Sequence, residues 1–229
     1  MKAASKILNT FAYGAIAPLR NLIVGLLLVP ATLQAETITI AALGDSLTAG
    51  YGLPQSDGFV PQLQAWLDAN GVDATVSNAG VSGDTTAGGL SRADWTLTPD
   101  VDAMIVTLGG NDFLRGIDPE NSKANLSAIL AKGQSAGVEM LLVGLTVSSN
   151  YGPEYQTAFQ GMYPALSQEF DVPLFPDFFA GMTEGRDMAE ARATLLQADG
   201  IHPNKEGVAL IVEAIGPAVA DLAERAASR

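Results

Sequence analysis

Short apolar runs alternate with longer amphipathic segments along this 229-residue chain from residue 36 onward. The runs have the length of strands, and they lie at residues 38–43, 74–77, 103–108 and 140–145, with a weaker fifth at 172–175. Strands that are buried on both faces of a sheet are apolar along most of their length, whereas strands with one wet face alternate. The near-continuous apolar character of these runs therefore predicts a parallel sheet covered by helices on both faces.

Segments with helical periodicity separate the apolar runs, at residues 60–70, 86–92, 122–136, 154–170 and 205–226. Gly71 and Gly137 follow two of these segments at the position where a glycine commonly ends a helix, and Pro61 suits a first helical turn. Strands that alternate with helices predict the α/β class. We expect a three-layer α/β/α sandwich whose parallel sheet is doubly wound, with the flavodoxin-like strand order.

The first 35 residues differ from the rest in composition. They contain three basic residues and no acidic one, and residues 22–29 form an apolar stretch that is too short for a comfortable membrane span. This pattern predicts an export signal at residues 1–35, cleaved before Glu36. Leu33 is unusual at the third position before that cut, which leaves retention as an N-terminal anchor open. Residues 36–229 show no linker-like tract or repeat and are expected to form a single domain.

The remaining chain is strongly acidic. Removing residues 1–35 takes three of the 12 basic residues and none of the 25 acidic ones, which leaves a formal charge of 9 − 25 = −16. This charge argues against nucleic acid as a partner and against docking on an anionic membrane surface. Cysteine is absent, which excludes disulfides, thiolate nucleophiles and cysteine-ligated metals and is compatible with an oxidising compartment. We expect a periplasmic or secreted monomer without stable membrane insertion after signal cleavage.

Small and polar residues gather where the predicted strands end. The first strand is followed by Gly44-Asp45-Ser46, the second by a glycine-containing stretch at residues 78–86, and the third by Gly109-Gly110-Asn111-Asp112. A further polar turn, residues 199–204, precedes the last helix. Ligands bind beyond the carboxyl ends of parallel strands, so we expect these segments to meet in one crevice.

A hydroxyl, an imidazole and a carboxylate in these segments predict nucleophilic catalysis. Ser46 lies at the end of a buried strand, although Asp45 or Ser46 could simply cap the next helix. His202 is the only histidine, and Asp199 lies three residues before it in the same turn. Asp199 could orient the imidazole and stabilise the imidazolium formed during attack. Asn204 can cap the helix that follows, which leaves Asp199 available for that role.

Acyl transfer also needs hydrogen-bond donors for the oxyanion that forms. The backbone N–H of Ser46, the backbone N–H of Gly83 and the side-chain amide of Asn111 are the candidates. Ordinary turn chemistry is the alternative for Gly83 and Asn111, because both residue types tolerate positive φ.

Together these four segments resemble the sequence blocks of the GDSL, or SGNH, hydrolase family: Gly44-Asp45-Ser46-Leu47, Gly83 within Ser82-Gly83-Asp84, Gly109-Gly110-Asn111-Asp112, and Asp199-Gly200-Ile201-His202-Pro203-Asn204. More narrowly they resemble its bacterial periplasmic acyl-CoA thioesterase, lysophospholipase and arylesterase branch. The Gly-x-Ser-x-Gly elbow of ordinary α/β-hydrolases is not matched, because residue 48 is threonine. The segment 52–55 is more arylesterase-like, which leaves the acyl-chain preference open.

The resemblance assigns roles to particular residues. It implies that Ser46 is the nucleophile, His202 the general base and then acid, and Asp199 its orienting carboxylate. Gly83 and Asn111 become oxyanion donors beside the Ser46 amide. It also places Asp45, Asp112 and Tyr151 at the substrate, with a mobile loop at residues 113–118 and an acyl groove flanked by residues 146–155.

The first hypothesis for function is a serine hydrolase that acts through an acyl-enzyme on carboxylic esters or thioesters, including lysophospholipids. It requires no metal and no organic cofactor. A second hypothesis keeps the triad and makes the substrate an O-acetylated carbohydrate. A third is a non-catalytic binding protein on the same scaffold.

Overall fold

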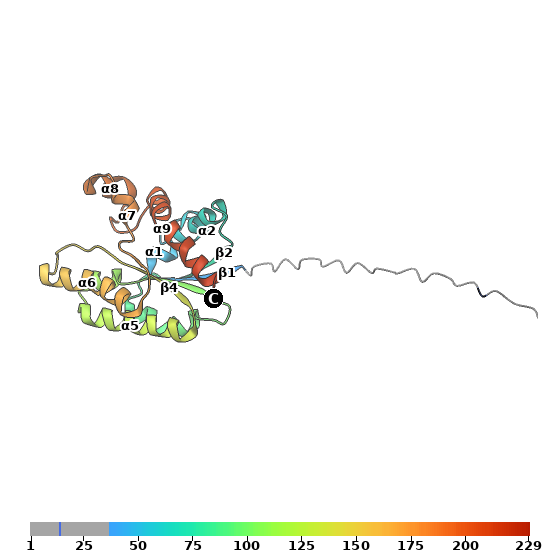
Figure 1. Ribbon diagram of the computed structural model, residues 1–229. Helices are drawn as coiled ribbons and strands as arrows, with labels where there is room; N and C mark the ends of the chain where they lie inside the picture. Colours follow the sequence, from blue (N-terminus) through green and yellow to red (C-terminus); the bar gives the residue numbers. More distant parts are fainter. Residues whose placement is uncertain (1–13, 15–36) are drawn as a thin grey trace, which may run out of the picture. The chain divides into compact units, whose positions relative to one another are not determined.

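The computed structural model describes residue 14 and residues 37–229 of the chain. Figure 1 shows these residues coloured along the sequence. Apart from Gly14, the export signal predicted at residues 1–35 lies outside the described residues, so it stays a prediction.

Five parallel strands form one sheet, in the order β2-β1-β3-β4-β5. The strands are β1 (Ile38–Gly44), β2 (Ala74–Gly80), β3 (Ala103–Thr107), β4 (Glu139–Val143) and β5 (Leu174–Phe175). This order confirms the predicted doubly wound, flavodoxin-like sheet. All residues of β3 and nearly all of β1 are buried, as their continuous apolar sequences predict.

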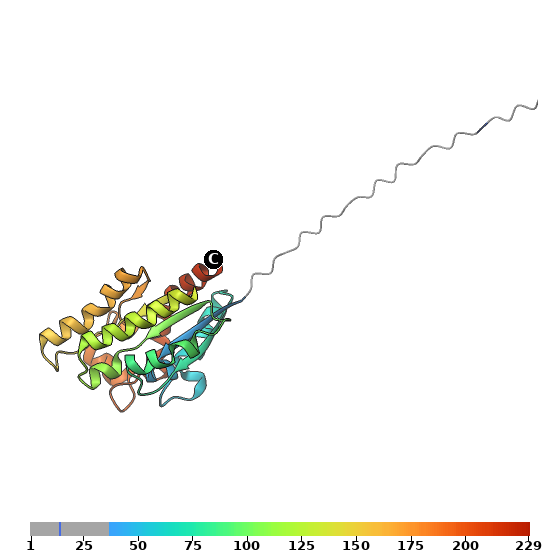
Figure 2. The same cartoon turned by 90° about the horizontal axis from the view of Figure 1, so that it is seen from below.

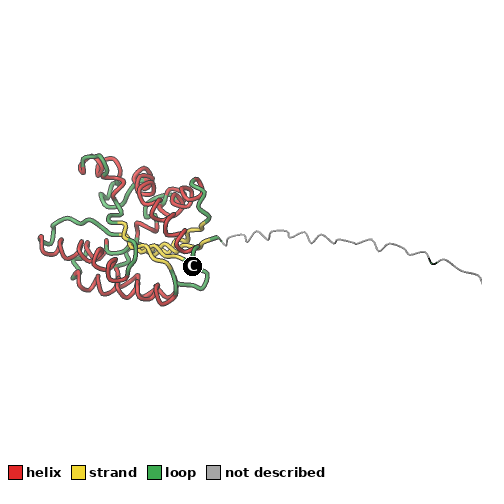
Figure 3. Tube along the Cα trace, in the orientation of Figure 1, coloured by secondary structure: helices red, strands yellow, loops and turns green. Residues whose placement is uncertain are grey.

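Helices cover both faces of the sheet, which confirms the three-layer sandwich (Figures 1 and 3). One face carries α2 (Phe59–Ala69) and α9 (Lys205–Ala227), and the other carries α3 (Thr86–Thr96), α5 (Pro119–Ala136) and α6 (Pro153–Phe170). Figure 2 shows α5 and α6 side by side along their lengths. Buried aliphatic side chains line the inner faces of these helices, including Leu63, Leu67, Leu126, Ile129, Ile211 and Ile215. This spacing of one residue in three or four places an apolar stripe against the sheet.

The bounds of the long helices differ from the predicted ones by a few residues. Helix α5 begins at Pro119 rather than at residue 122, because Asp118 caps it by accepting a hydrogen bond from Glu120 N at 3.0 Å. Gly137 ends that helix in the left-handed conformation, as predicted. The fourth strand ends at Val143, two residues early, because the buried Leu145 belongs to the loop that follows.

The structure also contains short helices that the sequence did not predict. They are α1 (Ser46–Ala49), α4 (Gly110–Leu114), α7 (Ala180–Thr183), α8 (Met188–Leu195) and a 3₁₀ turn, η1 (Gln55–Asp57). Each is too short to show an apolar period along the sequence. Two of them, α1 and α4, begin inside the motifs that the sequence predicts as turns.

Candidate active site

The register of the sheet aligns the ends of its three central strands. Gly44 at the end of β1 pairs with Gly80 of β2 on one side and with Thr107 of β3 on the other. The segments that follow these strands therefore start at the same edge, as the sequence predicts. They carry Ser46, Gly83 and Asn111.

Ser46 is the first residue of α1, which begins two residues after the end of β1. The preceding residue, Asp45, caps this helix through a hydrogen bond from Leu47 N to its Oδ1 at 2.9 Å. The Ser46 Oγ lies 2.8 Å from the His202 Nε2, although the two residues are 156 positions apart. The capping role that the sequence left open belongs to Asp45, and the Ser46 hydroxyl is left facing the imidazole.

The second ring nitrogen of His202 lies against Asp199. The distance from His202 Nδ1 to Asp199 Oδ2 is 2.7 Å. The other carboxylate oxygen accepts hydrogen bonds from Ile201 N at 2.9 Å and His202 N at 3.0 Å. The hydrogen bond with His202, followed by those from the two backbone N–H groups, lowers the pKa of Asp199 from 3.8 to about 2. Asp199 is therefore a carboxylate, which can orient the imidazole and stabilise an imidazolium.

Asn204 provides the helix cap that the sequence assigned to it. Its side chain accepts a hydrogen bond from Gly207 N at 2.9 Å at the start of α9. Among residues 37–229, the hydrogen bonds of the Asp199 carboxylate come from its own turn and from His202, because Asn204 caps α9.

Two residues that the sequence did not single out connect the Ser46 and His202 segments. The Tyr51 ring lies on the His202 ring, with centroids 4.6 Å apart and planes tilted by 39°. Gln197 Nε2 donates to Tyr51 O at 2.8 Å and to Pro203 O at 3.0 Å. Neither residue forms part of a local motif, so the sequence offers no signal for this connection.

The predicted oxyanion donors retain free N–H groups. Among residues 37–229, the backbone N–H groups of Ser46 and Gly83 have no protein acceptor. The side chain of Asn111, at the start of α4, donates one hydrogen from Nδ2 to Asp45 Oδ2 at 3.2 Å. A primary amide nitrogen has two hydrogens, so the second one remains available.

A glycine and a buried tyrosine hold the turn before Asn111. Gly109 has a φ of 124°, a conformation that L side chains rarely adopt. The Tyr163 hydroxyl from α6 donates to Leu108 O at 3.0 Å, directly below this turn. A Cβ at position 109 would collide with that hydroxyl. Glycine at position 109 is thus required by both backbone conformation and space.

The structure buries two of the three predicted substrate contacts. Asp45 is only 2% exposed, and its carboxylate accepts hydrogen bonds from Leu47 N and Asn111 Nδ2. Asp112 is fully buried, and its carboxylate accepts hydrogen bonds from Thr86 N, Thr86 Oγ1 and Ser122 Oγ at 2.8, 2.6 and 2.8 Å. It joins α4 to α3 and α5. Neither carboxylate is exposed in this structure, and both hold elements of the site together from within the protein.

Tyr151, the third predicted contact, is 48% exposed. Its hydroxyl donates to Leu114 O at 3.3 Å, and its ring packs edge-on against Phe113 with centroids 5.8 Å apart. The adjacent Tyr155 hydroxyl donates to Ile117 O at 2.8 Å. The segments 113–118 and 146–155 therefore lie side by side next to Asn111, where the resemblance placed an acyl groove.

Comparison with known proteins decides the family. The model of the GDSL-like lipase/acylhydrolase family matches residues 42–210, well over half of the chain. The chain belongs to this family. It is 38% identical over 198 residues to Esterase TesA of Pseudomonas aeruginosa, covering 86% of this chain and 95% of that protein. It is 37% identical over 181 residues to thioesterase 1/protease 1/lysophospholipase L1 of Escherichia coli K12, covering 78% of this chain and 82% of that protein.

A solved structure agrees with this assignment. The crystal structure of AlinE4, an SGNH-hydrolase family esterase, is 41% identical and superposes with a TM-score of 0.66. The match covers 81% of this chain and 96% of AlinE4. The SGNH hydrolase fold expected from the four motifs is therefore confirmed, and this GDSL hydrolase is an enzyme rather than a non-catalytic binding protein.

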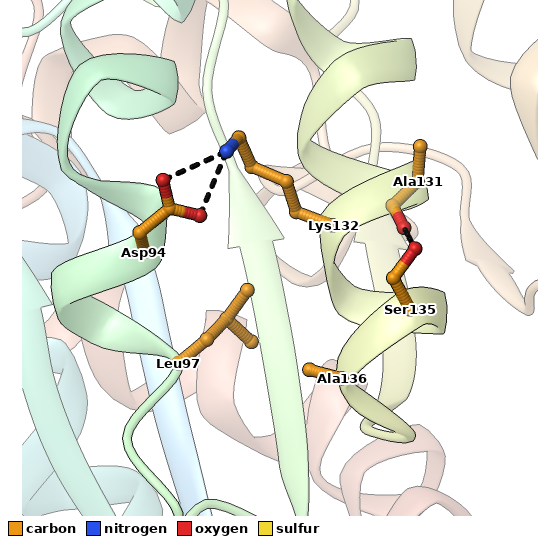
Figure 4. Close-up of a pocket in the computed structure, with 6 residues that line it drawn as sticks. All are labelled: Asp94, Leu97, Ala131, Lys132, Ser135 and Ala136. Carbon is orange, nitrogen blue, oxygen red and sulfur yellow. Dashed lines mark hydrogen bonds and ion pairs between the residues drawn. The ribbon is translucent and has the colours of Figure 1, made fainter.

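A hollow on another part of this GDSL hydrolase, within residues 37–229, is lined mainly by an ion pair and apolar side chains rather than by a nucleophile and a base. Figure 4 shows it between α3 and α5, where Lys132 binds both carboxylate oxygens of Asp94 at 2.7 and 2.8 Å. It lies toward the carboxyl ends of these helices, whereas Ser46 and His202 lie at helix amino ends on the opposite edge. In the described part of the chain, no group of three or more potential ligands could hold a metal ion, and no helix has the length and apolar character of a membrane span.

Asp45 is expected to make the stability of this GDSL hydrolase depend on pH. Burial raises the pKa of its carboxyl from 3.8 to about 6, despite the hydrogen bonds from Leu47 and Asn111 that lower it. The folded state therefore binds more protons than the unfolded state between these two values. The stabilisation from Asp45 is complete below pH 3.8 and is lost as the pH rises through about 6.

We predict that this loss disappears in Asp45→Asn, which can still cap α1 but does not titrate. The free energy of unfolding of the wild type, relative to that of Asp45→Asn, should fall by on the order of 2–3 kcal/mol between roughly pH 4 and pH 7. Urea unfolding of both proteins across this range measures the difference, in which the titration of other carboxylates largely cancels. A difference that does not change with pH would contradict the raised pKa.

Proposed function

We propose that this protein is a serine esterase that hydrolyses carboxylic esters and thioesters through an acyl-enzyme on Ser46. One observation carries the proposal: Asp199, His202 and Ser46 form a continuous hydrogen-bonded chain with distances of 2.7 and 2.8 Å. This is the arrangement that activates a serine hydroxyl for attack on a carbonyl carbon. Membership of the GDSL family supports the same reaction.

Acylation follows from the geometry. His202 Nε2 takes the proton from Ser46 Oγ as the oxygen bonds to the carbonyl carbon, and Asp199 stabilises the imidazolium that results. The carbonyl oxygen becomes an oxyanion, which accepts hydrogen bonds from Ser46 N, Gly83 N and the free Asn111 Nδ2 hydrogen. The tetrahedral intermediate then collapses, the bond to the alcohol or thiol breaks, and His202 gives its proton to the leaving group.

Deacylation repeats these steps with water. His202 removes a proton from a water molecule while the water oxygen attacks the acyl carbon, and the same donors hold the second oxyanion. Collapse of this intermediate breaks the bond to Ser46 Oγ, which regains a proton from His202. The products are the free acid and the regenerated serine, so the cycle needs no metal and no organic cofactor.

Exposed apolar side chains near the predicted site support the proposal that the enzyme binds the acyl group of its substrate. Six large apolar or aromatic side chains are prominently exposed among the described residues, and five of them belong to segments that carry site residues: Tyr51, Val81, Leu114, Tyr151 and Ile201. Such a gathering of exposed apolar residues is typical of a ligand-binding surface. The named activities of the relatives in Pseudomonas aeruginosa and Escherichia coli, an esterase and a thioesterase/lysophospholipase, point to the same substrates.

Export and a monomeric state complete the proposal. The basic residues and the apolar stretch within residues 1–35 support export to the periplasm or the medium. The strong negative charge of the remaining chain supports an enzyme that neither inserts into a membrane nor binds nucleic acid.

The experiment is hydrolysis of p-nitrophenyl esters of increasing acyl length by the chain from Glu36 onward, with palmitoyl-CoA and a lysophosphatidylcholine as further substrates. We expect hydrolysis of all three classes, with activity that extends to long acyl chains and is lost after treatment with a phosphonate that modifies an active serine. Activity confined to acetyl esters, together with acetate release from acetylated sugars, would support the O-deacetylase hypothesis instead. Absence of hydrolysis of every ester would refute the proposal.

A further inference from the structure

Arg92 binds three groups that belong to the edge of the sheet where the site lies. It projects from α3, and its side chain is only 20% exposed. The guanidinium donates from Nη2 to Gly44 O at 2.7 Å, from Nη1 to Ala79 O at 2.6 Å, and from Nε to Asp84 Oδ2 at 2.6 Å. One side chain therefore connects the ends of two strands to the turn that follows the second strand.

These acceptors flank two of the proposed oxyanion donors. Gly44 O lies two residues before Ser46, and Asp84 directly follows Gly83. Gly44 O also accepts a hydrogen bond from Val81 N at 3.0 Å, so it joins the end of β1 to the turn as well. The segments that present the Ser46 and Gly83 N–H groups are thus connected through Arg92 and the Gly44 carbonyl.

The peptide group after Gly83 is held on both of its sides. Its carbonyl oxygen accepts a hydrogen bond from Arg115 Nη2 at 2.8 Å, and its N–H, which belongs to Asp84, donates to Val81 O at 3.1 Å. Gly83 has a φ of 88°, which favours glycine. Within the turn this peptide is held by Arg115 and Val81, and Arg92 holds the turn itself against the strand ends through Asp84.

We propose that Arg92 is a positioning residue that sets the Gly83 N–H against the Ser46 N–H, so that both point at one oxyanion. This inference rests on the proposed function. An oxyanion site accelerates the reaction because its donors are in place before charge develops, so a displaced donor lowers the rate without weakening ground-state binding. The planar guanidinium has separate N–H groups for the three acceptors, whereas the ammonium of lysine is a single point of charge.

The first test is Arg92→Lys, which keeps the positive charge and removes the planar donor set. We expect kcat for p-nitrophenyl butyrate to fall by about 10- to 100-fold, as for a donor displaced by a fraction of an ångström, while KM changes by less than about twofold. Arg225→Lys is the matched control. Arg225 also binds a carboxylate, that of Glu139, through two N–H groups, at 3.2 and 3.1 Å, but it lies near the end of α9. It should leave kcat unchanged.

The second readout is inhibition by phenylboronic acid, which forms a tetrahedral adduct with an active serine and places an oxygen where the oxyanion forms. Arg92→Lys should weaken this inhibition by about the same factor as kcat, whereas a purely structural role would leave the affinity of folded protein unchanged. If Arg92→Lys does not fold, Asp84→Asn removes the charge of one acceptor and should show the same pattern at about 3- to 10-fold.

The result that overturns the inference is a folded Arg92→Lys or Asp84→Asn protein with wild-type kcat, or one whose kcat falls while its affinity for phenylboronic acid is retained. Failure of the proposed function looks different. In that case the wild type itself shows no ester hydrolysis that depends on Ser46.

Discussion

Replacing Ser46 by alanine is expected to lower kcat/KM for p-nitrophenyl butyrate by about 10⁴-fold or more. The substitution removes the oxygen that we propose forms the acyl-enzyme, and it leaves His202 Nε2 without the hydroxyl that lies 2.8 Å away. The residual rate comes from the oxyanion donors acting on attack by water. The fold should be retained, because the hydrogen bond that is lost joins Ser46 to the side chain of His202 and does not hold α1. That helix is capped by Asp45.

Ser135→Ala is the matched control for this prediction. The Ser135 hydroxyl donates to Ala131 O at 2.8 Å within α5, away from the triad. This variant should keep wild-type kcat/KM, and thermal unfolding should show that both variants are folded. Retention of more than about one per cent of the activity in folded Ser46→Ala protein would exclude Ser46 as the nucleophile.

The second large effect is expected for Asp199→Asn, which should lower kcat by about 10⁴-fold. The asparagine oxygen can still accept from Ile201 N and His202 N, which directs its NH₂ group at His202 Nδ1. Nδ1 must then accept a hydrogen bond, so the ring proton moves to Nε2 and faces Ser46. An imidazole in this tautomer cannot take the serine proton, and no carboxylate stabilises the imidazolium.

Asp187→Asn is the control, because Asp187 likewise accepts hydrogen bonds from two backbone N–H groups, Ala189 N and Glu190 N, but it caps α8 and does not contact His202. It should keep full activity. The wild-type carboxylate is ionised at neutral and mildly acidic pH, since the pKa of Asp199 is about 2, so the wild type has its orienting charge at both. A kcat within tenfold of the wild type would show that the carboxylate does not set the tautomer of His202.

Much of the fold could be predicted because the signals that carry it are local. Strand β3 is apolar at almost every position, and the stripe of α9 recurs with the helical period. The pairing of Asp199 with His202 is also local, since three residues in one turn bring the two side chains within reach. The four motifs could be placed at one edge because parallel strands that alternate with helices all end on the same side.

Other parts of the site could not be predicted because they depend on contacts between distant segments. Asp112 looks like a substrate contact beside Asn111, yet α3 and α5 bury it completely. The short helices α1 and α4 are held by hydrogen bonds and packing rather than by any apolar period.

The sequence by itself determined the fold class, since the periodicity of strands and helices encodes it. The flavodoxin-like strand order and the roles of Ser46, His202 and Asp199 were predictions from the motifs and their resemblance to a family. Only the tertiary structure decided which carboxylates are buried, that Tyr51 lies on the His202 ring, and that Arg92 joins the strand ends to the Gly83 turn. The physical reason is that burial and hydrogen-bond geometry depend on the packing of segments far apart in the chain, which no local pattern records.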